Sequence, residues 1–286
     1  MKIENMNECQ YPRTEITRRQ DRKAALAKAR AEIEARARAR HAIELAEHEK
    51  KLAERVAKKE RGEGMRGQPP KAPTPEPSPS DQYNFTDPQS RIMKAGSGQH
   101  FEQSYNAQAA VEVDSRLIVG ERVSQACNDK QELVPTVAAV AAPVASVAAV
   151  LADSGFYSEA AVRAVEQTPS GQPGGTTVYA ALAKKEHHRT VSDLEKKEEP
   201  AEPVAGAEMS EVMKHRLKTE VGKANYKLRQ QTVEPVFGII KSVMGFRQFL
   251  LRGLEKVGLE WQLVCVAYNL KRLHIMGAGL KRVCSE

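Results

Sequence analysis

The sequence is poor in aromatic residues, in cysteines and in long apolar runs, and each shortage excludes a class of protein. Only 5% of its 286 residues are aromatic, so a core must be built mainly from Ala and Val. No Cys-x-x-Cys pair occurs among the four cysteines (Cys9, Cys127, Cys265 and Cys284), which argues against a zinc site or a disulfide framework. Widely spaced reduced thiols are typical of a cytoplasmic protein.

The chain also lacks the apolar segments that membranes and secretion require. Its N-terminus has no apolar signal region, and its longest weakly polar run, residues 133–153, contains Pro135 and Pro143. We therefore expect no membrane span. Lys and Arg outnumber Asp and Glu, giving a formal net charge of +7. This balance favours a polyanionic partner, because Lys and Arg release counterions from phosphates, although charge alone leaves a merely basic protein equally open.

The N-terminal part, residues 1–62, is predicted to form one long charged helix. Between Arg18 and Arg61 the chain consists largely of Ala, Arg, Lys and Glu, and it contains no Gly or Pro before Gly62. Two pairs of apolar residues are spaced by a heptad, but they are out of register with each other. We therefore expect a solvated and poorly packed helix rather than a strong coiled coil.

A Pro-rich stretch, residues 63–82, follows the helix. Prolines cannot donate backbone hydrogen bonds, so the sequence predicts an extended, polyproline-like linker. The compact domain is expected to occupy residues 83–275, and residues 276–286 form a short tail.

The compact domain alternates extended and helical patterns, which predicts an α/β fold. Apolar runs around the polar turn at Asp114 predict a β-hairpin. From residue 187 to 210 the sequence is charged and predicts a surface insertion. The other expected elements are strands Tyr105 to Glu112, Leu117 to Gln125, Val144 to Asp153 and Thr177 to Leu182, helices from Lys130 to Ala142 (with Asn128 as its N-cap) and from Ser158 to Glu166, and terminal helices broken at Gly245, Gly253 and Gly277.

Two carboxylates stand at positions where chemistry is common. Asp153 ends the most apolar predicted strand, and ligand sites often form at the carboxyl ends of such strands, although an Asp there more often forms a turn or a cap. Glu234 precedes Pro235, which suits the first turn of a helix, and this would place Lys241 two turns further along the same side. An ordinary salt bridge explains this second pattern equally well.

Several segments together resemble the DDE transposases of bacterial insertion sequences. The first is Tyr-Asn-Ala-Gln-Ala-Ala-Val at residues 105–111, and the second is Leu-Ala-Asp-Ser-Gly-Phe-Tyr-Ser at residues 151–158. The third, residues 231–254, contains Val-Glu-Pro-Val-Phe-Gly and ends in Leu-Leu-Arg-Gly-Leu, and residues 261–270 are similar to the family's closing helix. Their order and spacing make the resemblance specific.

The resemblance implies a ribonuclease-H-like catalytic core, here incomplete and preceded by the charged helix and the Pro-rich linker. In such a core, we expect the hairpin to pair in the same sheet as the strand that ends at Asp153. Asp153 and Glu234 match the family's second aspartate and its glutamate, so they are the expected catalytic and metal-binding residues, normally with Mg²⁺. The residues expected to contact the DNA of the element ends are Tyr226, Arg229, Lys241 and Arg247. Tyr226, Arg229, Glu234 and Lys241 match a Tyr-Arg-Glu-Lys signature of the family. The gap between Arg229 and Glu234 is one residue longer than in the commonest form of this signature.

One departure from the family concerns its first catalytic aspartate, which precedes the charged helix. Residues 1–12 contain no Asp, and Asp87, Asp114 and Asp129 fall on a loop, a hairpin turn and a helix start. We therefore expect an N-terminally truncated transposase with impaired metal-dependent phosphoryl transfer. The alternatives are a non-catalytic DNA-binding or regulatory fragment and a folded remnant without function, and self-association stays open.

Overall fold

The computed structural model describes residues 10–62, 68–94, 100–140, 147–167, 174–182, 201–204 and 206–277. The chain divides into two compact units, residues 1–88 and residues 89–286, and each is described by itself. Among the described residues, no helix is both long and apolar enough to cross a membrane.

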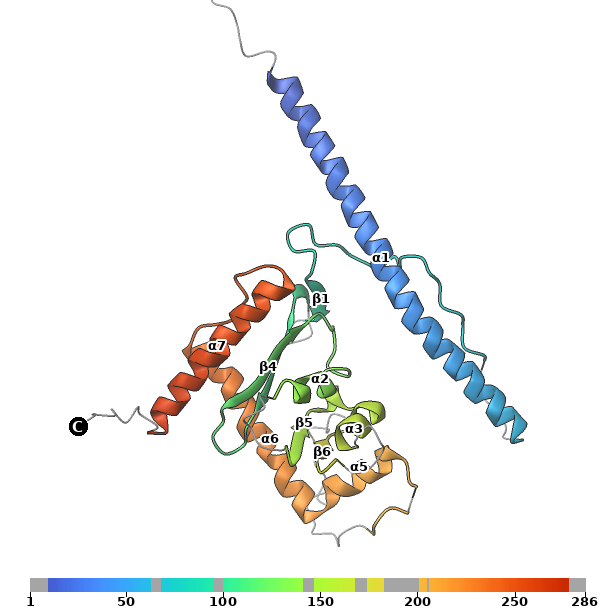
Figure 1. The fold of residues 1–286 in the computed structure, drawn as a ribbon, viewed down its shortest axis with the longest axis vertical. Helices are drawn as coiled ribbons and strands as arrows, with labels where there is room; N and C mark the ends of the chain where they lie inside the picture. The colour runs from blue at the N-terminus through green and yellow to red at the C-terminus, as the bar shows by residue number, and fades with distance from the viewer. Residues whose placement is uncertain are drawn as a thin grey trace, which may run out of the picture. The chain divides into compact units, whose positions relative to one another are not determined.

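The first unit is built on one helix, α1 (Gln10–Glu60), which has 51 residues (Figure 1). The expected helix is therefore present and begins before Arg18. Pairs such as Arg30 with Glu34 join successive turns along its surface and add small increments of stability. Most of its described side chains are exposed, and only Ala29 and Ala37 are buried.

Residues 68–88 run back along α1 as an extended strap. Their carbonyl groups have no β-ladder, and side chains of the helix donate to them instead. Arg40 and Asp81 form a bidentate ion pair, in which the two guanidinium Nη atoms lie 2.8 and 2.9 Å from the two carboxylate oxygens. The antiparallel course follows from the remaining contacts, which are Arg36 with the Gln82 and Pro88 carbonyls, His48 with the Pro70 carbonyl, and Arg55 with the Gln68 carbonyl.

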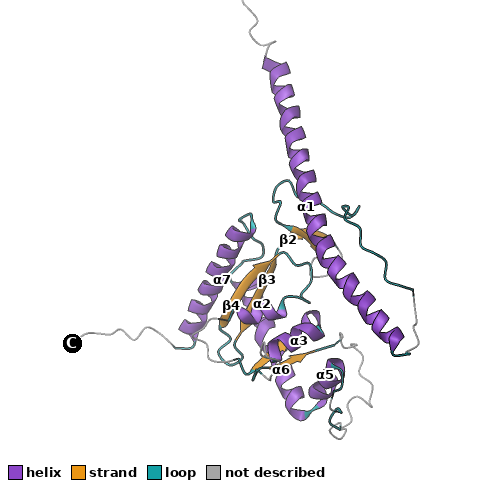
Figure 2. Cartoon of the chain, turned by 45° about the vertical axis from the view of Figure 1, so that its right-hand side comes forward, coloured by secondary structure: helices purple, strands orange, loops and turns teal. Residues whose placement is uncertain are grey.

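The second unit contains an antiparallel hairpin covered by the last helix. Strands β3 (Asn106–Val111) and β4 (Ile118–Ser124) pair as the sequence predicts, with a register shift after Ala110. Helix α7 (Leu254–Ile275) lies against the hairpin in Figure 2. Asn269 accepts from Ile118 N and donates to Ile118 O, both at 2.8 Å, while the Trp261 indole donates to Gln108 O at 2.9 Å. These bonds fix α7 on β3 and β4, and they surround a core of Ile118, Val236, Ile240, Trp261, Cys265 and Tyr268.

A parallel strand pair forms a second core in the same unit. Strand β5 (Ala149–Ala152) pairs with β6 (Thr177–Ala180), and helix α3 (Glu159–Glu166) is capped by Ser158, as expected. Helices α2 (Leu133–Ala138) and α5 (Met209–Lys218) also contribute to this core. The core residues are Leu133, Ala152, Ala161, Val162, Val178, Ala180 and Met213.

Helix α2 is shorter than the expected helix, which was to run from Lys130 to Ala142 with Asn128 as its N-cap. The Asn128 side chain accepts from Lys130 N at 3.2 Å and so stabilises a turn instead of the helix start. Glu132 occupies the cap position, and its carboxylate pairs with Arg122 at 2.7 Å. Residues 141–146, which include the start of the predicted third strand, lie outside the described residues, as do residues 187–200 of the expected insertion.

The strands of the described residues form three separate two-stranded sheets. One of them, β1 (Arg91–Lys94) with β2 (Phe101–Ser104), was not expected from the sequence. We also expected the hairpin to share a sheet with the strand that ends at Asp153, and this expectation is wrong, because β3 and β5 belong to different sheets. The fold is a mixture of helices and strands, as expected. Among the described residues, however, the pair β3–β4 and the pair β5–β6 are joined by packing and not by a hydrogen-bonded ladder.

Helix α6 (Glu220–Gly238) corrects a second expectation. Pro235 does not open a helix, since it lies near the end of α6, with Thr219 as the cap at the other end. A proline at this position removes one backbone donor from the helix. A wide π-turn, η2 (Ile239–Val243), continues the helix directly, and Met244 N donates to Ile239 O at 2.9 Å. Gly245, Gly253 and Gly277 have positive φ angles and mark the expected breaks.

The pair formed by Arg40 and Asp81 makes the packing of the strap sensitive to acid. The hydrogen bond from Arg40 is the largest cause that lowers the pKa of Asp81 below its ordinary value of 3.8. A carboxylate of this kind contributes its full stability above the unfolded pKa and loses it as the pH falls through the lower folded pKa. We expect the Asp81 carboxyl to titrate below 3.8 by NMR. Arg40→Ala should raise this midpoint, whereas Arg30→Ala, which removes an exposed pair on the same helix, should leave it unchanged.

Candidate active site around Asp153 and Glu234

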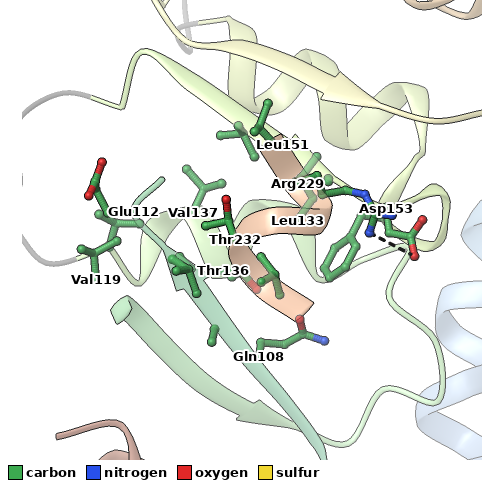
Figure 3. A pocket seen from close by; sticks show the side chains of 18 of the residues that line it. Gln108, Glu112, Val119, Leu133, Thr136, Val137, Leu151, Asp153, Arg229 and Thr232 are labelled. Atoms are coloured by element: carbon green, nitrogen blue, oxygen red, sulfur yellow. Dashed lines mark ion pairs between the residues drawn. The ribbon is translucent and has the colours of Figure 1, made fainter. Parts of the chain in front are cut away.

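Asp153 follows directly after β5 and begins a short 3₁₀ helix, η1 (Ser154–Phe156). Its Oδ1 accepts from Ser154 N at 2.7 Å, which fixes the carboxylate at the end of the strand. The other oxygen, Oδ2, lies 3.7 Å from Nη1 of Arg229 (Figure 3). The side chain is 56% exposed, so its oxygen atoms remain accessible from outside the protein.

Glu234 reaches the same guanidinium from helix α6. Its Oε1 lies 3.8 Å from Nη2 of Arg229, and the Glu234 side chain is 63% exposed. Asp153 and Glu234 are far apart in the sequence, yet one arginine brings them together. Distances of 3.7 and 3.8 Å describe charge contacts rather than short hydrogen bonds, so the arrangement leaves both carboxylates free to accept other partners.

Arg229 is held inside the protein and does not form part of an exposed basic surface. Its side chain is 17% exposed, its guanidinium lies 5.6 Å from the Tyr226 ring centre, and its Nε is buried. No described atom accepts a hydrogen bond from that Nε. This position is suited to holding two carboxylates, whereas the sequence predicted a DNA contact for Arg229.

Tyr226 is part of the same cluster. Burial is the largest cause that raises the pKa of Tyr226 above its ordinary value of 10. The positive charge of Arg229 lowers this pKa, and the negative charge of Asp153 raises it. Tyr226 is therefore neutral at physiological pH, and its ionisation reports on the charges around Arg229.

Lys241 and Arg247 form a separate exposed group. Arg247 Nε donates to the Lys241 carbonyl at 3.3 Å, and the Lys241 ammonium lies 5.9 Å from the Phe237 ring centre. Within the part of the chain that the structure describes, neither residue forms an ion pair with Asp153 or Glu234. The four residues of the expected Tyr-Arg-Glu-Lys signature thus separate into an inner cluster and an outer lysine.

Asp129 is a further carboxylate near this site, although its sequence context indicated only a helix start. Its Oδ1 accepts from the side-chain amides of Asn106 and Gln108, both at 2.8 Å. Its Oδ2 lies 3.4 Å from the position that a Cβ on Gly155 would occupy, so Asp129 is beside the turn that follows Asp153. No sequence signal indicated this, because Asn106 and Gln108 are distant in the chain.

A cavity of about 530 Å³ opens beside these residues, and Asp129, Asp153 and Arg229 contribute to its lining (Figure 3). Its other lining residues are mainly apolar and come from β3, β5, α2 and α6. Polar groups at the rim of an apolar cavity are typical of a binding site.

Asp153 and Glu234 offer donor atoms of the kind that a divalent cation binds, and each lies within 4 Å of the same guanidinium. Carboxylate oxygens are the ligands that Mg²⁺ prefers, and the positive guanidinium of Arg229 already occupies the space that both carboxylates face. Across the described ranges, no group of three or more His, Cys, Asp or Glu residues could hold a metal ion together.

Comparisons with known proteins connect this site with one family. Residues 188–274 match a family model described as "Transposase DDE domain", which supports a DDE-type transposase. The matched region includes Tyr226, Arg229 and Glu234, whereas Asp153 lies before it. No curated protein and no solved structure matches the chain.

The ionisation of Tyr226 tests whether Asp153 lies beside it. Since the Asp153 charge raises the pKa of Tyr226, Asp153→Asn should lower the midpoint of its titration. The measurement is an ultraviolet titration in which the spectrum of a Tyr226→Phe variant is subtracted, so that other tyrosines do not contribute. Asp114→Asn, which neutralises an exposed carboxylate of the hairpin turn, provides the control. An equal effect of both substitutions would show that Asp153 is not close to Tyr226.

Proposed function

We propose that this chain, as a DDE-type transposase, binds DNA and carries the remaining part of a metal-dependent phosphoryl-transfer site in which Asp153 and Glu234 are the metal ligands. The observation that supports the proposal is the convergence of these two carboxylates on Arg229 at 3.7 and 3.8 Å. Because Asp153 and Glu234 are far apart in the sequence, an ordinary ion pair between neighbouring turns of one helix does not explain why both carboxylates contact Arg229.

The two carboxylates would hold a single Mg²⁺ ion, because Mg²⁺ prefers oxygen ligands. When bound, such an ion polarises a phosphoryl oxygen or lowers the pKa of a coordinated water molecule. Without a bound metal, Arg229 neutralises one of the two negative charges of the pair, and its buried Nε restricts where the guanidinium can move. The guanidinium also lies over the Tyr226 ring, 5.6 Å from its centre, where a cation is attracted to the face of an aromatic ring.

We propose that catalysis by this chain is impaired. In-line phosphoryl transfer needs ions placed on both the attacking and the leaving oxygen, and two carboxylates shared with an arginine do not fix two ions. Among the described residues, no three His, Cys, Asp or Glu side chains lie together so that they could hold a metal ion, so Asp129 does not complete the site as a third ligand. The expected result is metal affinity without efficient strand cleavage.

We assign the DNA contact to the outer group formed by Lys241, Arg247 and Arg252, which are all exposed. Exposed cations can approach phosphates without the desolvation cost that Arg229 would meet. A non-catalytic DNA-binding or regulatory protein would use the same surface and would not need the carboxylates, so it is the second candidate function.

The experiment measures the binding of the full chain to a 5′-labelled duplex by fluorescence anisotropy at several salt concentrations. We expect weak binding that falls steeply with salt. The double variant Lys241→Gln with Arg247→Gln should reduce the slope of log affinity against log salt by about 2, roughly 0.9 for each phosphate that is no longer neutralised. Lys256→Gln, which removes an exposed charge from α7, should change the slope less. Binding that does not depend on salt would contradict the proposal.

A nicking assay on supercoiled plasmid with Mg²⁺ or Mn²⁺ separates the enzyme from the binding protein. We expect no cleavage above the background of the Asp153→Asn and Glu234→Gln variants. Nicking that requires metal and disappears in both variants, but persists in Asp114→Asn, would show a complete active site. It would then overturn the proposed impairment while supporting the assignment of the two carboxylates.

A further inference from the structure

Helix α7 has apolar residues on two opposite sides, and the hairpin covers one of them. The buried residues of the helix are Val257, Trp261, Cys265 and Tyr268. Since an α-helix turns by about 100° per residue, a second apolar set lies on the opposite side. We call this set the outer seam, and its side chains are between 54% and 71% exposed: Leu259, Leu263, Val266 and Leu270. Figures 1 and 2 both show α7 at one side of the second unit.

A neighbouring loop extends the apolar surface of the outer seam. Leu250 N donates to the carboxylate of Glu260 at 2.9 Å, which holds the loop beside the residue that follows Leu259. Leu250 itself is 75% exposed. Isolated exposed leucines are common on protein surfaces, whereas a continuous row of them is typical of an interaction site.

The spacing of the outer seam identifies the kind of partner. Its residues are separated by four, three and four positions, which is the spacing of the contact residues in a coiled coil. The spacing is the same when it is read from either end. An antiparallel second copy of α7 would therefore place its Leu270 opposite Leu259 and its Val266 opposite Leu263, about a two-fold axis at the centre of the seam.

Charged residues beside the outer seam favour the antiparallel direction. In that arrangement Glu260 of one copy lies level with Lys271 of the other, on the same side of the seam, and symmetry gives this pair twice. A parallel pair in register would instead place Glu255 beside Glu260 of the other copy. Opposite charges in the first case and like charges in the second select the antiparallel pair.

We propose that the outer seam binds the outer seam of a second copy of this chain, so that two α7 helices form an antiparallel pair. At roughly 100 Å² for each apolar side chain, the eight side chains of two copies would bury about 800 Å². Stable interfaces begin at roughly 1,200 Å², so this dimer is weak and forms reversibly. The inference does not depend on the proposed function.

Sedimentation velocity of the full chain over a range of concentrations tests the pairing. Nuclease treatment and high salt prevent DNA from bridging two copies. We expect a monomer–dimer equilibrium with a dissociation constant on the order of 10–100 µM, as the small interface implies. Leu263→Glu should weaken it at least about 100-fold, because each copy would have to remove a carboxylate from water at the centre of the seam.

Two comparisons separate this effect from unfolding and from pairing through another helix. Leu263 is 71% exposed, so Leu263→Glu should leave the circular dichroism spectrum and the Tm unchanged. Leu26→Glu makes the same change at a leucine of α1 that is 53% exposed, and it should leave the dissociation constant unchanged.

Crosslinking with a short bismaleimide tests the direction of the two helices. Cys265 is buried and is kept, whereas Ser replaces the other cysteines, Cys9, Cys127 and Cys284. A mixture of Leu259→Cys and Leu270→Cys chains should give a crosslinked dimer. Leu259→Cys alone should not, because the antiparallel arrangement separates its two copies by about 16 Å along the helix axis.

Three outcomes would overturn the proposal. One is a monomer at concentrations about ten times above the expected constant, which would leave the outer seam to another segment or another protein. Another is a dimer that Leu26→Glu disrupts and Leu263→Glu does not, which would assign the pairing to α1. The third is crosslinking of Leu259→Cys alone that equals crosslinking of the mixture, which would exclude the antiparallel arrangement.

Discussion

Helix α6 connects the two cores of the second unit, and the candidate site depends on this connection. Near its end, Val236 packs with Trp261 beneath the hairpin, while earlier residues of the helix lie against β5 and β6. In the described residues β3 and β5 belong to different sheets, so no ladder sets the distance between the two strand pairs. Packing on α6, together with α2, which contacts β3 and β4 and contributes Leu133 to the second core, therefore determines where Asp153 lies relative to Glu234.

Arg229 makes this arrangement electrostatically possible. Two carboxylates that converge without a cation would repel each other, and one guanidinium neutralises only one of their two charges. The pair retains a net negative charge, and because the Asp153 and Glu234 side chains are 56% and 63% exposed, this charge faces solvent. A divalent ion would compete with Arg229 for the same oxygen atoms, so metal affinity and arginine position are coupled.

The sequence predicted the elements whose signals are local. The apolar runs around Asp114, the apolar strand before Asp153, the Ser158 cap and the terminal glycines all act within a few residues, and the structure contains each of them. Pro235 misled the prediction, because a proline next to Glu234 suits a helix start equally well, and tertiary packing decided against it. The strap along α1 depends on contacts such as Arg40 with Asp81, which periodicity does not reveal.

The site was partly predictable for the same reason. The resemblance selected Asp153, Glu234, Tyr226 and Arg229, and the structure places all four in one cluster. It did not indicate that Arg229 is buried between the carboxylates, that Asp129 is held by Asn106 and Gln108, or that the strand pairs leave a cavity between them. These features depend on residues that meet only after folding.

The central claim is that Asp153 and Glu234 act together on one cation. Mn²⁺ affinity of the full chain, measured by electron paramagnetic resonance, tests it through a double-mutant cycle with Asp153→Asn and Glu234→Gln. If both carboxylates hold one ion, each single variant loses most of the affinity and the double variant loses little more. Losses that add independently, or affinity that is unchanged in either single variant, would contradict the account.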